Sequence, residues 1–225
     1  MQSTHTPIIL GITGHHNTGK TTVAQLLEIH VHARVMAFSD GIYTEVAQAF
    51  GCSILDLANR SLKATPQRLL ALHNCSDKAF VQCVLPHAEG DLLTPRTPRQ
   101  ILEWWGTEYR RAQNPDYWVQ ATAQRIQHYH SKGCRRPIVL ADVYKHNEAQ
   151  LIRHLHGTLW RLERPGHEQR TAHITSTEHL QIQADLTLHN IADVAHLQHI
   201  TLNHWHELQR YGHHASASGL LQTPP

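Results

Sequence analysis

The residues from Gly14 to Thr21 have the types and spacing needed to hold a phosphate group. They read GHHNTGKT, which fits the pattern G-x-x-x-x-G-K-[ST], and they follow the apolar run 7–12. Two glycines let the backbone curl so that N–H groups point at phosphate oxygens, and a helix beginning there presents its positive end. The motif predicts phosphate binding, the alternative being a glycine-rich turn that only caps a helix. The predicted phosphate-binding residues are Gly14, Asn17, Thr18, Gly19, Lys20, Thr21 and Thr22.

Within this motif, Lys20 is expected to reach the terminal phosphates of ATP, and the Thr21 hydroxyl to ligate Mg²⁺. A second metal ligand is predicted at Asp142, which ends the apolar run 137–141. An acidic residue in that place supports magnesium in phosphate-loop enzymes. An aspartate after an apolar run also serves as a helix cap or turn former, so the phosphate loop is what favours the metal-binding role.

Phosphoryl transfer also needs cations to cover the charge on the transferred group and on its acceptor. Most arginines are solvated surface groups, so composition alone does not single one out. A helix is predicted from Thr97 to about Gln113, because Thr97 can cap it and Pro98 suits its first position. Arg99 and Arg111 gain weight because they lie on this helix. We expect Ile101, Leu102, Trp105 and Tyr109 on its buried face and Trp104, Glu108 and Arg111 on an adjoining polar face. The candidate cations are Arg60, Lys63, Arg99, Arg111, Arg161 and Arg164.

The elements that must position these residues follow from the hydrophobic pattern. Apolar runs bounded by turn signals predict five strands, with helices between them, and this alternation indicates a mostly parallel sheet. We therefore predict an α/β fold of the three-layer αβα P-loop NTPase type. The strands are expected near 7–13, 35–38, 137–142, 158–163 and 186–189.

The domain organisation is expected to be one kinase-type domain over 1–211 with a tail over 212–225. A helix after the second strand is predicted to end at Gly51. Between about 52 and 134 the sequence shows no convincing strand, which indicates a helical insertion that binds the acceptor substrate. The tail is small, polar and without apolar periodicity, so we expect it to be frayed.

Composition narrows the class of protein. The chain has 225 residues, with 20 Lys and Arg against 18 Asp and Glu, so no strong field favours nucleic acid or a membrane as partner. The sequence shows no leader and no run of 18 apolar residues, so we expect a cytoplasmic protein. Four cysteines without a C-x-x-C pair predict reduced thiols, and we expect the 22 histidines to be solvated.

One stretch makes the sequence recognisable. Residues 97–119 resemble the deoxynucleoside monophosphate kinases of bacteriophages and prophages, whose pattern is S/T-P-R, a short apolar helix, G-T-E-x-x-R and then W-V. Four further blocks are similar to this family in the same order over roughly 7–200. They are 59–63 (D-R-x-L-K in the family), 142–148 (D-V-R-F-x-N-E-A), 162–166 (I-x-R-P-G) and 184–190 (D-x-x-I-x-N).

The resemblance implies transfer of the ATP γ-phosphate to the 5′-phosphate of a deoxynucleotide, with Mg²⁺, in the cytoplasm of a bacterial or phage-infected cell. It implies catalytic roles for Lys20, Arg99, Arg111 and Asp142. Its aromatic set Trp104, Trp105, Tyr109, Tyr117 and Trp118 either stacks on a base or forms core, and core is favoured for Trp105 and Tyr109. The implied substrate-binding residues are Asp40, Arg60, Lys63, Arg99, Trp104, Thr107, Glu108, Arg111, Trp118, Lys145 and Glu148.

The chain departs from the family pattern at Tyr144 and Tyr43, which stand where basic residues are usual, and Lys145 is a candidate replacement for the lost charge. The family's serine-glutamate pair is matched only loosely, over 173–178. Two alternatives therefore stay open: a kinase for another small metabolite, such as dephospho-coenzyme A or a sugar acid, and a nucleotide-binding protein without turnover. The accepted bases also stay open, as does the choice between a monomer and a homodimer.

Overall fold

The computed structural model describes residues 7–166 and 178–211, and the chain divides into two compact units. Met1–Ala37 and Lys132–Pro225 form the first, here called the sheet unit. Phe38–Ser131 form the second, the helical unit. The predicted tail over 212–225 and most of the match at 173–178 lie outside the described residues.

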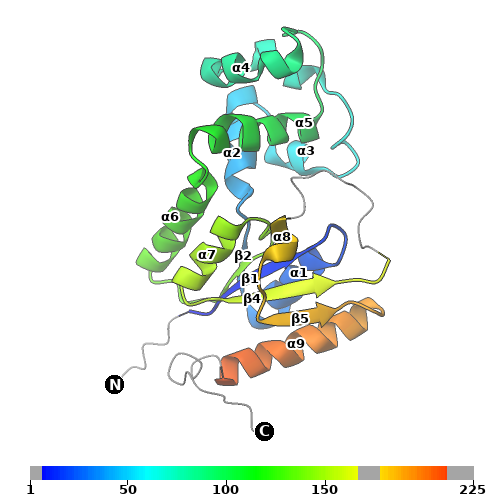
Figure 1. Ribbon diagram of the computed structural model, residues 1–225, viewed down its shortest axis with the longest axis vertical. Helices are drawn as coiled ribbons and strands as arrows, with labels where there is room; N and C mark the ends of the chain where they lie inside the picture. The colour runs from blue at the N-terminus through cyan, green and yellow to red at the C-terminus, as the bar shows by residue number, and fades with distance from the viewer. Residues whose placement is uncertain (1–6, 167–177, 212–225) are drawn as a thin grey trace. The chain divides into compact units, whose positions relative to one another are not determined.

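Five strands form the sheet in the order β2-β3-β1-β4-β5, and every neighbouring pair is parallel (Figure 1). The prediction of a mostly parallel five-stranded sheet is therefore confirmed. In the centre of the sheet, Gly11 of β1 pairs with Leu140 on one side and Leu159 on the other. The strands are β1 (Ile9–Gly14), β2 (Arg34–Met36), β3 (Ile138–Leu140), β4 (Thr158–Glu163) and β5 (Leu186–His189).

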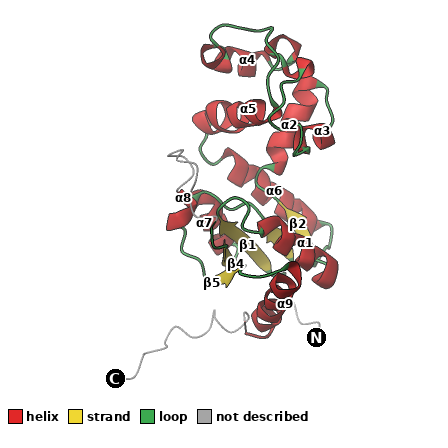
Figure 2. Cartoon of the chain, turned by 90° about the vertical axis from the view of Figure 1, so that its right-hand side faces the viewer, coloured by secondary structure: helices red, strands yellow, loops and turns green. Residues whose placement is uncertain are grey.

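Helices cover both faces of this sheet, which gives the predicted three-layer αβα fold. Figure 2 shows α7 and α8 on one side of the strands and α1 on the other. Strand alternation explains the layering, because Leu10 and Ile12 share a buried cluster with side chains of α1 and α9, whereas Gly11 faces α7. A Cβ at Gly11 would collide with the Ile152 side chain of α7, so a larger residue there would force that side chain to move. These helices are α1 (Lys20–Val31), α7 (His146–His154), α8 (Glu178–Gln181) and α9 (Val194–Tyr211).

The helical unit begins at Phe38, earlier than the predicted insertion, because α2 packs on α3, α5 and α6. Between 52 and 134 the structure has no strand, only one antiparallel bridge from Gln67 to Arg96, and Gly51 ends α2 as predicted. Its α-helices are α2 (Asp40–Phe50), α3 (Ile54–Ala58), α4 (Lys78–Val84), α5 (Pro98–Glu103) and α6 (Tyr117–Ser131). Its other helical segments are the π-helix η4 (Trp104–Arg111) and the 3₁₀ turns η1 (Arg68–Leu70), η2 (Leu72–Asn74) and η3 (Pro86–Ala88).

The helix predicted from Thr97 begins as expected, but it changes type halfway. The Thr97 hydroxyl accepts a hydrogen bond from the N–H of Gln100 at 3.1 Å, and Pro98 takes the first turn. From Trp104 the backbone is π-helical, so side chains beyond that point are rotated from their α-helical positions. Trp104 itself, at the start of the π-helix, is 9% exposed and packs in the core, so its predicted polar position is wrong.

A single carboxylate ties the π-helix to its neighbours. Glu45 of α2 accepts hydrogen bonds from Trp105 Nε1 at 2.7 Å, Tyr117 Oη at 2.7 Å and Arg110 Nε at 2.8 Å. The Arg110 guanidinium also lies over the ring of Tyr109, 4.5 Å from its centroid. Glu45 therefore fixes the segment that carries several predicted acceptor-binding residues.

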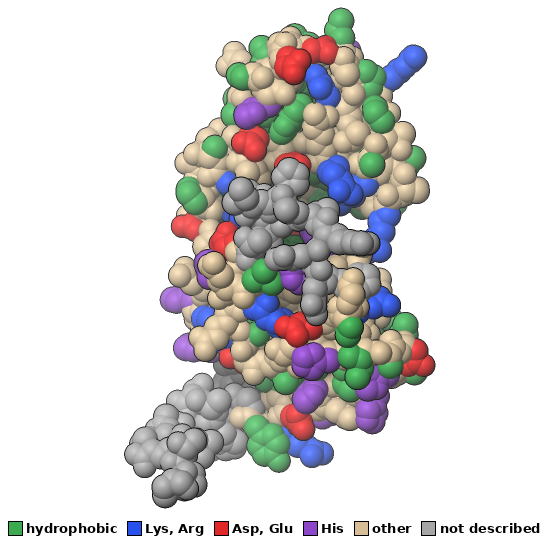
Figure 3. Space-filling model, turned by 45° about the vertical axis from the view of Figure 1, so that its right-hand side comes forward, with side chains coloured by type: hydrophobic (Ala, Val, Ile, Leu, Met, Phe, Trp, Pro, Cys, Tyr) green, Lys and Arg blue, Asp and Glu red, His purple; other side chains and the backbone are tan. Residues whose placement is uncertain are grey.

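The remaining composition-based expectations concern cysteine, histidine and membrane contact. All four cysteines are free thiols, as predicted. Figure 3 shows histidine side chains on the surface of the sheet unit, and α9 exposes His199 and His206. The expectation of solvated histidines is wrong for His179, which is buried at 4% exposure. Over 7–166 and 178–211, no helix is both long and apolar enough to cross a bilayer.

Candidate functional site

The predicted phosphate loop connects β1 to α1, and its backbone needs its glycines. Gly14 has φ 134° and Gly19 has φ 109°, values that side-chain-bearing residues rarely adopt. A Cβ at Gly14 would also collide with the carbonyl oxygen of Leu162 in β4. At Gly19 no side chain caps α1, and the first turn of α1 contains no acidic residue. The first N–H groups of α1 and its positive end are thus available to an anion.

Hydrogen bonds hold the loop from inside and from β5. The Thr18 hydroxyl donates to the carbonyl oxygen of His15 at 2.9 Å. Asn190, directly after β5, donates from Nδ2 to the carbonyl oxygen of Thr18 at 2.9 Å and is 8% exposed. A Cβ at Gly19 would approach Asn190 Nδ2 to 2.9 Å, so Asn190 and Gly19 fit one another. The prediction of site residues missed Asn190, although its place after the last strand could have suggested it.

Lys20 points back into the loop. Its ammonium donates to the carbonyl oxygens of Gly14, at 2.8 Å, and His15, and its side chain is buried. The pKa of Lys20 is lowered to about 8, because the effect of burial, which lowers it, outweighs that of the negative charge of Asp142, which raises it. The loop therefore holds a buried cation whose described hydrogen-bond partners are uncharged.

Asp142 lies at the carboxyl edge of the sheet beside the loop. It follows β3, and β3 is the neighbour of β1. Backbone bonds fix its position on both sides: Ala141 N–H donates to Met36 O, and Val143 N–H donates to Ile12 O, each at 3.1 Å. Carboxyl ends of parallel strands share one edge, which is where such folds bind ligands. Asp142 therefore lies at the ligand-binding edge of the sheet, close enough to Lys20 for its charge to raise the pKa of that ammonium.

Aromatic rings that the prediction did not connect pack against the loop. The rings of His16 and Tyr144 are stacked, with centroids 5.6 Å apart and planes at 27°. The His179 ring meets Tyr144 edge-on at 5.9 Å and His15 at 4.7 Å. Burial, with the charges of Asp142 and Glu148, raises the pKa of Tyr144 far above its usual value, so its phenol stays neutral. Sequence spacing gave no signal for this cluster, because α8 brings His179 to the loop from far along the chain.

Two residues predicted to bind substrate, Glu148 and Lys145, have contacts that fix the start of α7. The Glu148 carboxylate accepts hydrogen bonds from the N–H of Tyr144 at 2.8 Å and of Lys145 at 3.0 Å. The Lys145 ammonium pairs with Glu178 at 2.9 Å, and Glu178 also accepts from the N–H of His146. Burial tends to raise the pKa of Glu178, but these partners outweigh it and leave the pKa lowered. The substrate roles of Lys145 and Glu148 stay predictions.

The candidate cation Arg161 also has a structural set of partners. Its guanidinium donates to the carbonyl oxygens of His179 and Leu180, each at 3.3 Å, and to that of Ile182. Arg161 therefore anchors α8 and the residues after it to β4.

In the helical unit, the structure brings three predicted or discussed acceptor-site residues together. The Lys63 ammonium donates to Tyr43 Oη at 2.9 Å, and the N–H of Arg99 donates to the carbonyl oxygen of Lys63 at 3.1 Å. Tyr43 thus stands beside a cation although it replaces one in the family pattern. Asp40 has a different partner, since it pairs with Arg125 at 2.8 Å.

The other predicted acceptor residues lie between α3 and α5 and on η4. Arg60 is exposed in the segment between α3 and α5, and Thr107 is exposed on η4. The carbonyl oxygen of Glu108 accepts from Cys83 Sγ at 3.3 Å, and Arg111 Nη1 lies 3.5 Å from the carbonyl oxygen of Pro115. These contacts leave the substrate roles of Glu108 and Arg111 as predictions.

The predicted base-stacking role of Trp118 does not fit its environment. Trp118 is 1% exposed, and its Nε1 donates to the carbonyl oxygen of Gly106 at 3.0 Å. Its edge also lies against Gly41, where a Cβ would come within 2.8 Å. A ring enclosed in this way has no free face for a base. Trp105 and Tyr109 are 1% and 5% exposed and belong to the same core, as the sequence favoured.

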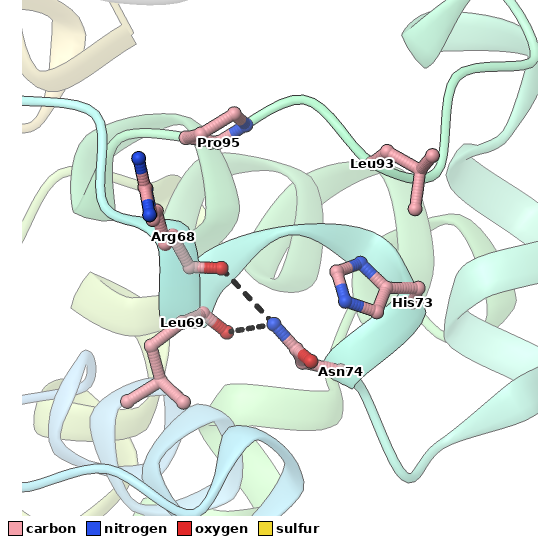
Figure 4. Close-up of a pocket in the computed structure, with 6 residues that line it drawn as sticks. All are labelled: Arg68, Leu69, His73, Asn74, Leu93 and Pro95. Carbon is pink, nitrogen blue, oxygen red and sulfur yellow. Dashed lines mark hydrogen bonds between the residues drawn. The ribbon is translucent and has the colours of Figure 1, made fainter.

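A cavity of about 610 Å³ lies in the helical unit (Figure 4). Asn74 Nδ2 shapes one wall by donating to the carbonyl oxygens of Arg68 at 3.0 Å and Leu69 at 3.3 Å. None of the predicted site residues lines this cavity. Its lining residues are Arg68, Leu69, His73, Asn74, Leu93 and Pro95.

Comparison with known proteins gives structural likeness without a family. No family model and no curated protein matches the chain. The solved structure of TT1252 from Thermus thermophilus matches with a TM-score of 0.48 and 18% identity, over 91% of this chain and 99% of that one. A sugar kinase from Janibacter sp. matches with a TM-score of 0.40 and 13% identity, over 90% and 93% of the two chains. Likeness at this level assigns no function.

Proposed function

We propose that this chain is a kinase that transfers the γ-phosphate of ATP to the 5′-phosphate of a deoxynucleoside monophosphate, with Mg²⁺. The observation that carries the proposal is the loop after β1, where the Lys20 ammonium is held by the carbonyl oxygens of Gly14 and His15 beside Asp142. A buried cation, an uncapped helix start and a nearby carboxylate are together suited to a triphosphate and its metal ion.

In this proposal, each polar group around the phosphate loop of the sheet unit has its own role in phosphoryl transfer. The N–H groups of the loop and of the α1 start hold the phosphates, and Lys20 neutralises charge on the transferred group. Thr21 and Asp142 would hold the magnesium ion, directly or through water. When bound, that ion supplies positive charge to the phosphate oxygens. Catalysis in this class depends mainly on positioning and electrostatics, so no activated nucleophilic side chain is required.

The acceptor belongs to the helical unit in this proposal. Lys63 and Arg99, joined through the backbone, are cations with which a phosphate monoester can pair, and a guanidinium does so with two parallel hydrogen bonds. The preference for a deoxynucleotide rests on the resemblance of residues 97–119 to the phage and prophage enzymes.

An ADP-release assay with direct product identification tests the proposal. The protein receives ATP and Mg²⁺ with each of the four deoxynucleoside monophosphates, the ribonucleotides, or dephospho-coenzyme A as acceptor. We expect a deoxynucleoside diphosphate as product. A product from another acceptor alone would reassign the substrate. ATP binding without any product would replace the proposal by a nucleotide-binding protein without turnover.

A further inference from the structure

The Lys20 ammonium has an aromatic face on one side, and the proposed phosphoryl transfer does not by itself explain that face. Two directions around Nζ are taken by the carbonyl oxygens of Gly14 and His15. On a third side the ring centroid of Tyr144 lies 5.1 Å away, within the range of a cation–π contact. Lys20 is thus held by three uncharged groups.

The ring of Tyr144 is itself fixed. Its backbone N–H donates to Glu148 at 2.8 Å, which places the residue at the start of α7. His16 stacks on the ring with an interplanar angle of 27°, and His179 meets it edge-on at 84°. With loop, helix start and α8 all in contact with it, Tyr144 presents a fixed face to Lys20.

The position of this ring affects how the charge of Lys20 is held in the loop. Lys20 and Asp142 carry opposite charges, so they attract one another, and this attraction raises the pKa of Lys20. If Lys20 turned to pair with Asp142, each would neutralise a group that the triphosphate or its metal ion needs. An aromatic ring attracts an ammonium without neutralising it, so it can hold Lys20 in the loop while leaving its charge available.

We propose that Tyr144 is a positioning residue that keeps the Lys20 ammonium directed into the phosphate loop through the face of its ring. The proposal rests on the proposed function only in requiring that the loop binds ATP. In the family that the sequence resembles, a basic residue is usual at the position of Tyr144. The role proposed here belongs to the face of the Tyr144 ring and not to its hydroxyl.

Equilibrium binding in the absence of any acceptor tests it, with Tyr144→Leu and Tyr144→Phe compared with the unchanged protein. Tyr144→Leu removes the ring face and is expected to weaken ATP binding by about three- to tenfold. Tyr144→Phe keeps the face and should bind ATP within about twofold of the unchanged protein. Adenosine, which has no phosphate for Lys20 to reach, should bind all three proteins alike.

A double-mutant cycle separates positioning from a general packing defect. In a Lys20→Met background, Tyr144→Leu should have no further effect on ATP binding, because the cation that the ring positions is gone. Unchanged ATP binding by Tyr144→Leu would overturn the proposal, and so would equal losses for Leu and Phe or for ATP and adenosine. If the unchanged protein does not bind ATP, the proposed function fails as well. If it binds ATP but transfers no phosphate, only the proposed reaction fails.

Discussion

The sheet unit and the helical unit differ in what their charged side chains contact. Around the phosphate loop, Lys20 bonds to carbonyl oxygens and faces a ring, and α1 starts without a side-chain cap. In the helical unit, Glu45 accepts three side-chain hydrogen bonds, including one from Arg110, and Asp40 pairs with Arg125. The first arrangement leaves charge available to a ligand, whereas the second uses charge to hold helices together.

The two arrangements also differ in how they affect the stability of the fold. Burying Lys20 among uncharged groups disfavours its cation, as its lowered pKa shows, so the loop is maintained at some cost in stability. Glu45 sits in a network whose hydrogen-bond partners come from η4 and α6, so that network favours the folded state. Substitutions in the sheet unit should therefore change binding and catalysis most, and those in the Glu45 network should change stability most.

The largest expected effect is on catalysis. Lys20→Met removes the cation beside the transferred phosphate and should lower phosphoryl transfer from ATP by about a thousandfold. Lys132→Met is the matched control, because Lys132 is an exposed lysine of the same unit. The measurement is ADP release under saturating ATP, with circular dichroism to show that both variants fold. Near-normal turnover by Lys20→Met would contradict the assignment of this loop as the catalytic site.

The next effect is on stability and belongs to the helical unit. Glu45→Leu leaves Arg110 without its carboxylate and leaves the Trp105 and Tyr117 donors unpaired. We expect the free energy of unfolding to fall by about 2–4 kcal/mol. Urea unfolding followed by tryptophan fluorescence measures this, and Glu103→Leu, at an exposed position on α5, is the control. Equal stability losses in the two variants would mean that Glu45 does not organise the unit.

A smaller effect is expected at the residue that supports the loop from β5. Asn190→Ala removes the hydrogen bond to the carbonyl oxygen of Thr18 and opens space beside Gly19. Losing one hydrogen bond that orders the loop should weaken ATP binding by about tenfold. Calorimetric titration with ATP is the measurement, and Asn203→Ala, on the exposed side of α9, is the control. A loss of ATP affinity in both variants would instead indicate a general effect.

The same comparison explains which predictions succeeded. The strands and the phosphate loop depend on neighbouring residues: apolar runs predicted all five strands, and Gly14 and Gly19 adopt the backbone that their spacing implied. The position of Asp142 follows from parallel topology, because adjacent strands end at one edge. Local pattern and strand direction were enough for this part of the candidate site.

The helical unit shows where local pattern was insufficient. A switch from α-helix to π-helix at Trp104 changes which face each later side chain occupies, and the helical period gave no sign of it. Trp118 was predicted to bind substrate, since from sequence alone an aromatic side chain can either stack on a base or pack in the core. Only its long-range packing against Gly41 and Gly106 shows that it belongs to the core. The contact between Tyr144 and His179 likewise depends on where α8 docks.

The smallest predicted effect tests the energetic cost of the loop through pH. The Lys20 pKa is lowered from 10.5 to about 8 in the folded protein. Above pH 8 the folded state has released a proton that the unfolded state still binds, so folding becomes more favourable as pH rises toward 10.5. Lys20→Met lacks this group, and other titrations are common to both proteins. The unfolding free energy of the unchanged protein, relative to Lys20→Met, should therefore increase by about 1 kcal/mol between pH 8 and pH 9. A difference that is flat or falls with pH, measured by urea unfolding, would mean that the loop holds Lys20 without this cost, and the energetic contrast between the two units would not hold.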